Sequence, residues 1–204
     1  MSRDTQIKVC GLTRASDVEC CVRLGVDTIG LNFWPGTPRV TTASFAREMV
    51  VSFPKQEFVA VFVNASVSEI QAIRAETGIR WVQLHGNETP AEVEACQRFA
   101  YKALRLAEEQ DVRDAALFGG ERILVDARVE GAMPGGTGHS FPWVWAKSLS
   151  ERRRVVLAGG LHPANVADAI RAIAPWQVDV ASGVESAPGV KDHSLLRRFV
   201  EAVE

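Results

Sequence analysis

Residues 154–160 read RVVLAGG and residues 178–183 read VDVASG, two short apolar runs that each end in small residues. Six runs of similar character precede them: QIKVC (6–10), TIGLNF (28–33), FVAVFV (58–63), RWVQLH (80–85), YKALRL (101–106) and RILVD (122–126). They are rich in Val, Ile and Leu and do not alternate cleanly between apolar and polar residues. Such runs are typical of parallel strands that are buried on both faces.

The spacing of the runs indicates how they are connected. Successive strand centres lie between 20 residues (Val9 to Ile29) and 33 residues (Leu124 to Leu157) apart. Each gap is long enough for the right-handed helical crossover that parallel strands require. Eight such units predict an α/β protein, a single-domain (β/α)8 TIM barrel that spans residues 1–204. A doubly wound open sheet is the structural alternative, because counting strands does not separate the two folds.

Helices are predicted between the strands. Apolar residues recur at helical spacing, for example in 67–73 and 195–203. The start signals are capping boxes at Ser66 with Glu69 and Thr89 with Glu92, and prolines suited to the first helical position at Pro90 and Pro163.

Composition places the chain among ordinary globular proteins. It has 204 residues, 47% of them hydrophobic, and a formal net charge of −2, which argues against a dedicated nucleic-acid surface. The polar opening MSRDTQIK and the shortness of the most apolar run argue against a signal peptide and a membrane span. Four cysteines are too few for a disulfide scaffold. We therefore expect a cytoplasmic protein with no nucleic-acid or membrane partner. The sequence leaves the oligomeric state open between a monomer and a homodimer.

Polar or small residues stand where the strands end. In a TIM barrel these positions carry the catalytic groups. They are Cys10, Asn32, Asn64, His85, Arg105, Asp126, Gly159 with Gly160, and Ser182 with Gly183. The pairs after the seventh and eighth strands lie where a barrel commonly holds a phosphate on backbone N–H groups. Short glycine motifs are also ordinary turns, so both interpretations stay open.

Two loops carry further candidate residues. The long connection GAMPGGTGHSF (131–141) contains Gly135, Gly136, Thr137 and Gly138. A long loop in a compact barrel is often a ligand loop, although this one also fits a solvated turn. The loop WPGTPRV (34–40) presents Arg39, which suits a carboxylate ligand or plain solvation.

The ordered series of motifs resembles phosphoribosylanthranilate isomerase of tryptophan biosynthesis, a family of small TIM barrels. The matching segments are KVCGLT (8–13), PRV (38–40), VFVN (61–64), QLHG (83–86), LVDA (124–127), GGTG (135–138), LAGGL (157–161), DVASGVES (179–186) and PGVKDH (188–193). Each is weak alone, but together they occur in order along nearly the whole chain.

The resemblance implies an Amadori rearrangement, in which the aminoaldose N-(5-phosphoribosyl)anthranilate becomes an aminoketose. This chemistry needs one acid and one base and no cofactor. By the resemblance, Asp126 is the acid and Cys10 the base. Asp126 must then be protonated despite a reference pKa of about 3.9, and Cys10 must reach the thiolate from a reference pKa of about 8.5. Lys8 lies on the same face of the strand as Cys10, so its positive charge is a candidate for stabilising the Cys10 thiolate.

The remaining roles implied by the resemblance concern binding. Arg39 is expected to hold the anthranilate carboxylate, and His85 and Thr137 to support the site by hydrogen bonding. The phosphate is expected among Gly136, Gly138, Gly159, Gly160, Ser182 and Gly183. Gln83, Asp179 and the Lys191–His193 segment match the family pattern without an assigned role. Val40 replaces an aromatic residue that the family often has after the arginine, so Phe33 or Trp34 is expected against the ring.

Three other functions compete with this one. A histidine-pathway or dual-specificity isomerase performs the same rearrangement, but that family has an aspartate at the position of Cys10. A non-catalytic phosphosugar-binding barrel needs the glycine motifs and no Cys–Asp pair. A metal-dependent epimerase is disfavoured because the four histidines lack metal-ligand spacing.

Overall fold

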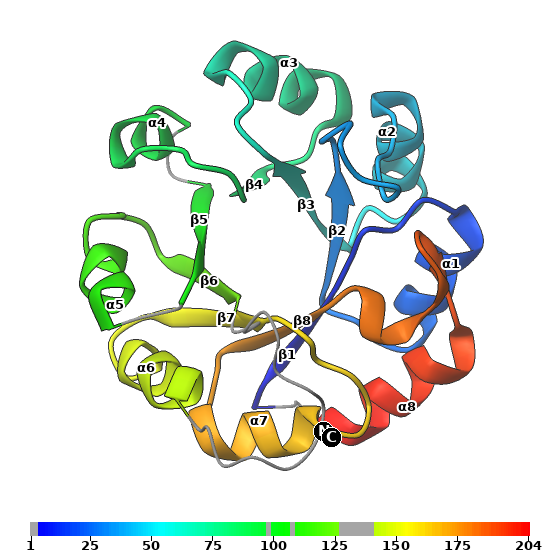
Figure 1. The fold of residues 1–204 in the computed structure, drawn as a ribbon. Coiled ribbons are helices and arrows are strands. Elements are labelled where there is room, and N and C mark those ends of the chain that lie inside the picture. The colour runs from blue at the N-terminus through cyan, green and yellow to red at the C-terminus, as the bar shows by residue number, and fades with distance from the viewer. Residues whose placement is uncertain (1–3, 97–98, 107–108, 127–140) are drawn as a thin grey trace.

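The computed structural model describes residues 4–96, 99–106, 109–126 and 141–204. Eight parallel strands close into one barrel in sequence order (Figure 1). They are β1 (Gln6–Cys10), β2 (Thr28–Asn32), β3 (Glu57–Phe62), β4 (Trp81–Leu84), β5 (Ala100–Arg105), β6 (Arg122–Asp126), β7 (Arg154–Ala158) and β8 (Gln177–Val180). The predicted (β/α)8 barrel is confirmed, and the open sheet is excluded because β1 pairs with β8.

Eight helices surround the barrel in the described part of the chain (Figure 1). They are α1 (Ala15–Arg23), α2 (Ala43–Ser52), α3 (Val67–Thr77), α4 (Pro90–Ala95), α5 (Glu109–Ala115), α6 (Phe141–Ser150), α7 (Val166–Ile173) and α8 (His193–Val203). Both predicted capping boxes are present, and Pro90 opens α4 as predicted.

The expectation for Pro163 is wrong, because α7 begins at Val166. Asn165 provides the physical reason. Its Oδ1 accepts a hydrogen bond from the His162 N–H at 2.8 Å, and its side-chain amide donates to the Gly160 carbonyl at 3.0 Å. These bonds hold the segment around Pro163 in a turn that precedes the helix.

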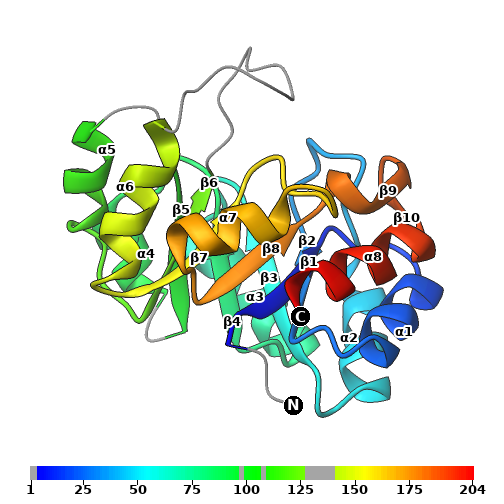
Figure 2. The same ribbon diagram turned by 90° about the horizontal axis from the view of Figure 1, so that it is seen from below.

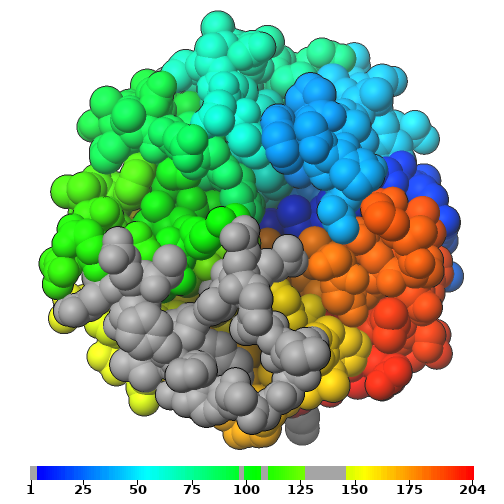
Figure 3. Space-filling view, viewed as in Figure 1, coloured from blue at the N-terminus to red at the C-terminus, as the bar shows by residue number. Residues whose placement is uncertain are grey.

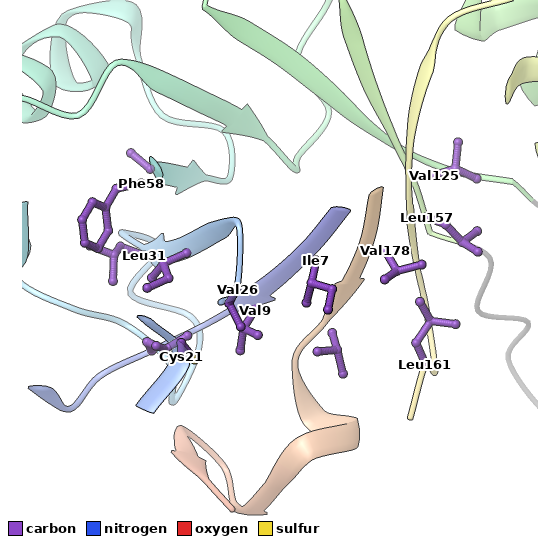
Figure 4. Close-up of a cluster of buried hydrophobic side chains, with 14 of the residues drawn as sticks. Ile7, Val9, Cys21, Val26, Leu31, Phe58, Val125, Leu157, Leu161 and Val178 are labelled. Carbon is purple, nitrogen blue, oxygen red and sulfur yellow. The ribbon is translucent and has the colours of Figure 1, made fainter. Parts of the chain in front are cut away.

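The strand side chains form two apolar layers. Those that point outward pack against the helices, among them Ile7, Val9 and Val178 (Figure 4). The inward-pointing set forms a second cluster that includes Val59, Tyr101 and other residues of β3, β5, β6 and β7. This arrangement explains the absence of clean alternation, since both faces of each strand are covered.

The amino-terminal end of the barrel is closed by a stacked arginine. The Arg122 guanidinium lies 3.7 Å from the Trp81 ring centre and 4.6 Å from that of Trp176. It also donates to both carboxylate oxygens of Glu57, at 2.8 and 3.2 Å. This group is far from the carboxyl ends of the strands and has a structural role.

A short excursion after β8 was not predicted. A single 3-10 turn, η1 (Ser182–Val184), leads into the antiparallel strands β9 (Glu185–Ala187) and β10 (Val190–Lys191). Figure 2 shows this excursion near α1 and α8. Asp17 of α1 binds it, because its Oδ2 accepts from the Lys191 N–H at 3.1 Å.

Two further observations concern the described residues as a whole. All four cysteines are free in the structure. Among the helices of the described segments, none has the length and apolar character needed to cross a bilayer.

Candidate active site

A cavity of about 330 Å³ opens at the carboxyl ends of the strands. In Figure 3 the dark blue atoms from near the start of the chain lie recessed near the centre of this face. The cavity brings together these predicted residues: Cys10, Arg39, His85, Asp126, Gly159, Gly160, Ser182 and Gly183. Gly136, Thr137 and Gly138 lie outside the described residues.

Cys10 ends β1 and is half-buried against the cavity. Space for its sulfur exists because the neighbouring residue on β2 is Gly30, with which it is in register. A Cβ on Gly30 would lie 2.7 Å from the Cys10 Sγ. Gly11 follows with φ +74°, which turns the chain out of the barrel.

The surroundings of Cys10 shift the pKa of its thiol in opposite directions. Burial raises the pKa of the Cys10 thiol above its ordinary value, whereas the positive charges of Lys8 and Lys191 lower it. Burial dominates, so these surroundings favour the neutral thiol. Lys8 therefore reduces the cost of forming the thiolate but does not by itself produce one.

Lys8 lies beneath Cys10 on the same face of β1, as predicted, and is fully buried. Its ammonium donates to the Asp179 Oδ2 at 2.8 Å and to the Gln83 Oε1 at 2.9 Å. Burial is the largest single effect and opposes the charge, but the Asp179 carboxylate, Cys10 and Tyr101 together outweigh it and raise the pKa of Lys8. The other Asp179 oxygen, Oδ1, is buried without a hydrogen-bond partner among the described residues.

His85 follows β4 and lines the cavity. Its side chain is open to the cavity, while the protein around the rest of the ring removes enough water to lower its pKa. The Nδ1 atom lies 2.9 Å from the Gln83 Nε2. A neutral imidazole is therefore present at neutral pH.

Asp126 ends β6 and contributes to the same cavity, half-buried at its edge. The strand before it, RILV, is fully buried, so the carboxyl group is fixed at the boundary between the apolar barrel and the cavity. Its negative charge acts on His85, where it favours the protonated ring against the effect of burial.

Arg39 reaches the cavity from the loop after β2 and is held by Glu185. The Nε donates to Oε1 at 2.9 Å and Nη2 donates to Oε2 at 2.6 Å. Lys191 also donates to the Glu185 Oε1 at 2.9 Å and to the Cys10 carbonyl at 2.8 Å. This pairing fixes the guanidinium plane and leaves Nη1 outside the two bonds.

The two aromatic candidates of the second loop differ in position. Trp34 lines the cavity and is 41% exposed. Phe33 instead stacks on Phe62, with ring centres 5.4 Å apart, and belongs to the outer core. Val40 is exposed at the loop's end. Trp34 is thus the aromatic side chain of this loop that faces the cavity.

The opposite side of the cavity consists of backbone from the loops after β7 and β8. Gly159 and Gly160 have φ of +97° and +66°, a conformation that favours glycine. A Cβ on Gly183 would collide with the Leu161 carbonyl oxygen, so only glycine lets the two loops approach. Ser182 begins the η1 turn, whose first N–H groups have no partner within the turn.

Several site residues had no role assigned from the sequence. Gly30 and Glu185 act through contacts with strands and loops distant in sequence, and no local pattern marks them. Gln83 and Asp179 carry a detectable signal, because each is a polar residue within a buried strand. Among the described residues, no group of three His, Cys, Asp or Glu side chains could hold a metal ion.

The chain matches the family model described as N-(5'phosphoribosyl)anthranilate (PRA) isomerase over residues 7–202. A curated isomerase of that name from Leptothrix cholodnii is 43% identical over 202 residues, which cover 98% of this chain and 90% of the relative. The chain belongs to the phosphoribosylanthranilate isomerase family. The predicted resemblance and the assignment as an isomerase enzyme are confirmed.

Solved structures of phosphoribosylanthranilate isomerases agree with this assignment. The Thermotoga maritima enzyme has a TM-score of 0.87 and 33% identity, with 98% of each chain covered. A second family structure, in complex with reduced 1-(o-carboxyphenylamino)-1-deoxyribulose 5-phosphate, has a TM-score of 0.83 and 32% identity, again with 98% of each chain covered.

Proposed function

We propose that the chain catalyses the Amadori rearrangement of N-(5-phosphoribosyl)anthranilate in tryptophan biosynthesis, with Asp126 as general acid and Cys10 as general base. The observation that supports these roles is that one cavity is lined by both residues, by Arg39 and by the glycine-rich loops after β7 and β8. An acid, a base, a carboxylate partner and a phosphate cradle are the four elements that this substrate needs.

The acid acts first in this mechanism. Protonated Asp126 donates to the furanose ring oxygen, the bond between that oxygen and C1 breaks, and the nitrogen lone pair forms a cationic Schiff base. Asp126 is left as a carboxylate. The buried residues of β6 before it place this carboxyl group at the edge of the cavity, where it can reach the substrate.

The base acts second. The Cys10 thiolate removes the C2 proton, and the electron pair moves into the C1–C2 bond to neutralise the Schiff base as an enolamine. Protonation of C1 and loss of the enol proton give the ketone. Because burial keeps the free thiol neutral, we infer that the adjacent cationic Schiff base supplies the charge that favours the thiolate.

Binding groups hold the two ends of the substrate. Arg39 would pair with the anthranilate carboxylate through Nη1, with Trp34 beside the ring. Backbone at Gly159, Gly160, Ser182 and Gly183 would hold the phosphate. Gly136, Gly138 and Thr137 stay assigned to the phosphate end by the resemblance alone.

The cellular setting is part of the same proposal. We place the reaction in the cytoplasm, with one domain over residues 1–204, no cofactor and no nucleic-acid partner. We propose a monomer or homodimer, and a dimeric phosphoribosylanthranilate isomerase is known from Thermotoga maritima. Light scattering on the purified chain measures this state directly.

The test is an assay that follows the loss of substrate fluorescence on freshly generated aminoaldose. Cys10→Ser and Asp126→Asn are each expected to lower kcat by about 10²–10⁴-fold, and Arg39→Ala to raise mainly KM. Cys20→Ser, which changes a buried cysteine of α1, is the matched control and should retain the wild-type kcat. Near-wild-type turnover by Cys10→Ser would remove that residue from the mechanism. Faster turnover of the two-phosphate histidine-pathway aminoaldose would favour the rival isomerase.

A further inference from the structure

The orientation of the Gln83 amide is determined by its neighbours. Gln83 is 1% exposed, and its Oε1 lies 2.9 Å from the Lys8 Nζ and 3.0 Å from the Tyr101 hydroxyl. An ammonium group donates and never accepts, so the atom facing Lys8 must be the amide oxygen. The amide nitrogen, with its two N–H donors, is then the atom that faces His85.

This orientation fixes the protonation pattern of His85. The Gln83 Nε2 lies 2.9 Å from the His85 Nδ1 and can only donate to it. Nδ1 must therefore be the unprotonated, accepting nitrogen. In a neutral imidazole the proton then resides on Nε2, and His85 becomes a hydrogen-bond donor through that atom. Because the Lys8 ammonium can only donate, it fixes the orientation of the Gln83 amide, and Gln83 in turn fixes which nitrogen of His85 carries the proton.

We propose that His85 is a catalytic residue that donates its Nε2–H to the oxygen on C2 of the substrate, and that Gln83 is the positioning residue that gives it this polarity. The proposal rests on the proposed function, because it uses the same substrate and the same cavity. His85 and Cys10 both line that cavity, and Cys10 acts on the carbon that carries this oxygen.

The chemistry favours a neutral donor at this place. As Cys10 removes the C2 proton, the C2 hydroxyl becomes an enol oxygen and then a ketone oxygen, which is a better acceptor. A donor to this oxygen stabilises the ketone, and the transition state in which the enol proton is lost, more than the starting hydroxyl. A neutral N–H adds no charge beside the cationic Schiff base, whereas an imidazolium would repel it. A neutral imidazole with a lowered pKa polarises a carbonyl in this way in another aldose–ketose isomerase.

The charged groups around the ring are consistent with this assignment. Burial and the positive charges of Lys8 and Lys102 disfavour the imidazolium, while Asp126 and Asp179 favour it. The pKa of His85 is lowered overall. The ring is therefore neutral during turnover at neutral pH.

The first experiment reads the tautomer without any assay. Nitrogen-15 NMR of the wild-type chain is expected to show His85 protonated on Nε2 and bare on Nδ1. In Gln83→Glu the carboxylate can only accept, so the same spectrum should show Nδ1 protonated. Gln177→Glu makes the same change at another buried interior position, where Gln177 donates to the Thr28 hydroxyl, and should leave the His85 signals unchanged. A wild-type ring protonated on Nδ1 would overturn the proposal even if the enzyme were fully active.

The second experiment reads catalysis. His85→Gln places an amide donor near the position of Nε2, and His85→Glu places an acceptor there. We expect His85→Gln to retain at least about tenfold more kcat than His85→Glu, and Gln83→Glu to lose about 10²-fold in kcat. Equal kcat in the two His85 variants would reject the donor role while leaving Cys10 and Asp126 untouched. If the Cys10→Ser variant instead kept the wild-type kcat, the proposed function would be rejected. If Gln83→Glu does not fold, the donor role of His85 is still tested by the wild-type NMR spectrum and by comparing His85→Gln with His85→Glu.

Discussion

Gly30 lies directly against Cys10, so that a single added methyl group on Gly30 would stand 2.7 Å from the sulfur and 3.1 Å from the Cys10 Cα. The two residues are register partners across β1 and β2. The position of the proposed base is thus set by the absence of a side chain on the neighbouring strand.

Gly30→Ala is expected to move Cys10 and to lower kcat by about 10²-fold, because small displacements of a reacting group have large effects. Overpacking should also cost about 1–3 kcal/mol of unfolding free energy. Steady-state kinetics and urea unfolding measure both. Gly119→Ala is the control, since a Cβ there meets no atom within 4 Å. Cys10→Ala in the Gly30→Ala background should recover part of the stability; no recovery would show that the sulfur is not what clashes.

Lys8→Met is expected to raise the pKa of the Cys10 thiol further, because it removes a positive charge that favours the thiolate while burial still opposes it. Alkylation rate against pH, with Cys10→Ser as the blank, follows this pKa. The single variant also leaves Asp179 buried and unpaired, so Lys8→Met with Asp179→Asn serves as the neutral comparison. An unchanged alkylation profile in Lys8→Met would show that Lys8 does not act on Cys10.

Glu185→Gln is expected to raise KM several-fold to about tenfold with a smaller change in kcat, because Arg39 loses its bidentate partner. The reduced product analogue, which carries the same carboxylate, should bind more weakly by a similar factor. Asp168→Asn is the control, since it breaks only the exposed pair with Arg171 on α7. A fall in kcat at constant KM would place the effect of Glu185 elsewhere, through Lys191 and the Cys10 carbonyl.

Arg122→Met is expected to lower the unfolding free energy by about 1–3 kcal/mol, because it removes the charge stacked between Trp81 and Trp176 and its bonds to Glu57. Urea unfolding measures this change. The kcat of the folded variant should stay at the wild-type value, since Arg122 closes the opposite end of the barrel. Arg171→Met removes an exposed pair with Asp168 and should cost less than about 0.5 kcal/mol. Equal losses in the two variants would contradict the proposed role of the stack.

Asp17→Asn is expected to remove part of the acid sensitivity of the fold. Burial opposes the Asp17 charge, but bonds from Arg14 and His193 outweigh it and lower the pKa of Asp17. A carboxyl with a lowered folded-state pKa stabilises the protein above its unfolded value, about 3.9, and loses this contribution as pH falls through the folded value. The variant should be about 1–3 kcal/mol less stable at pH 7 and converge with wild type as the pH falls through the lowered folded-state pKa of Asp17. Urea unfolding across this range tests it, and a constant difference at all pH values would contradict it.

The barrel could be predicted from the sequence because its signals are local. Each strand is an apolar run buried on both faces, and each crossover has its own helical spacing, as in RILV before Asp126 or the capping box at Ser66. The strands β9 and β10 could not be predicted, since three and two residues are too few to establish a periodicity.

The site could be predicted only in part, for a related reason. Strand ends and glycine pairs are visible in sequence, but the contacts that tune them join distant positions. Lys8 meets Gln83 and Asp179 across separations of 75 and 171 residues. Gly30 leaves room for the Cys10 side chain only because the register of β1 and β2 places the two residues opposite each other. Such relationships follow from the register of strand pairing and from barrel closure, which no local pattern contains.

The pairing of β1 with β8 has a consequence for how the protein is made. During synthesis on the ribosome, Lys8 emerges long before Asp179, so the ion pair beneath Cys10 cannot form until the eighth strand has been translated. Until then the nascent sheet has two unpaired edge strands, and Lys8 lacks the Asp179 carboxylate that balances its charge. Pairing of β8 with β1 therefore closes the sheet and, in the same event, brings Asp179 to Lys8 beneath the Cys10 sulfur.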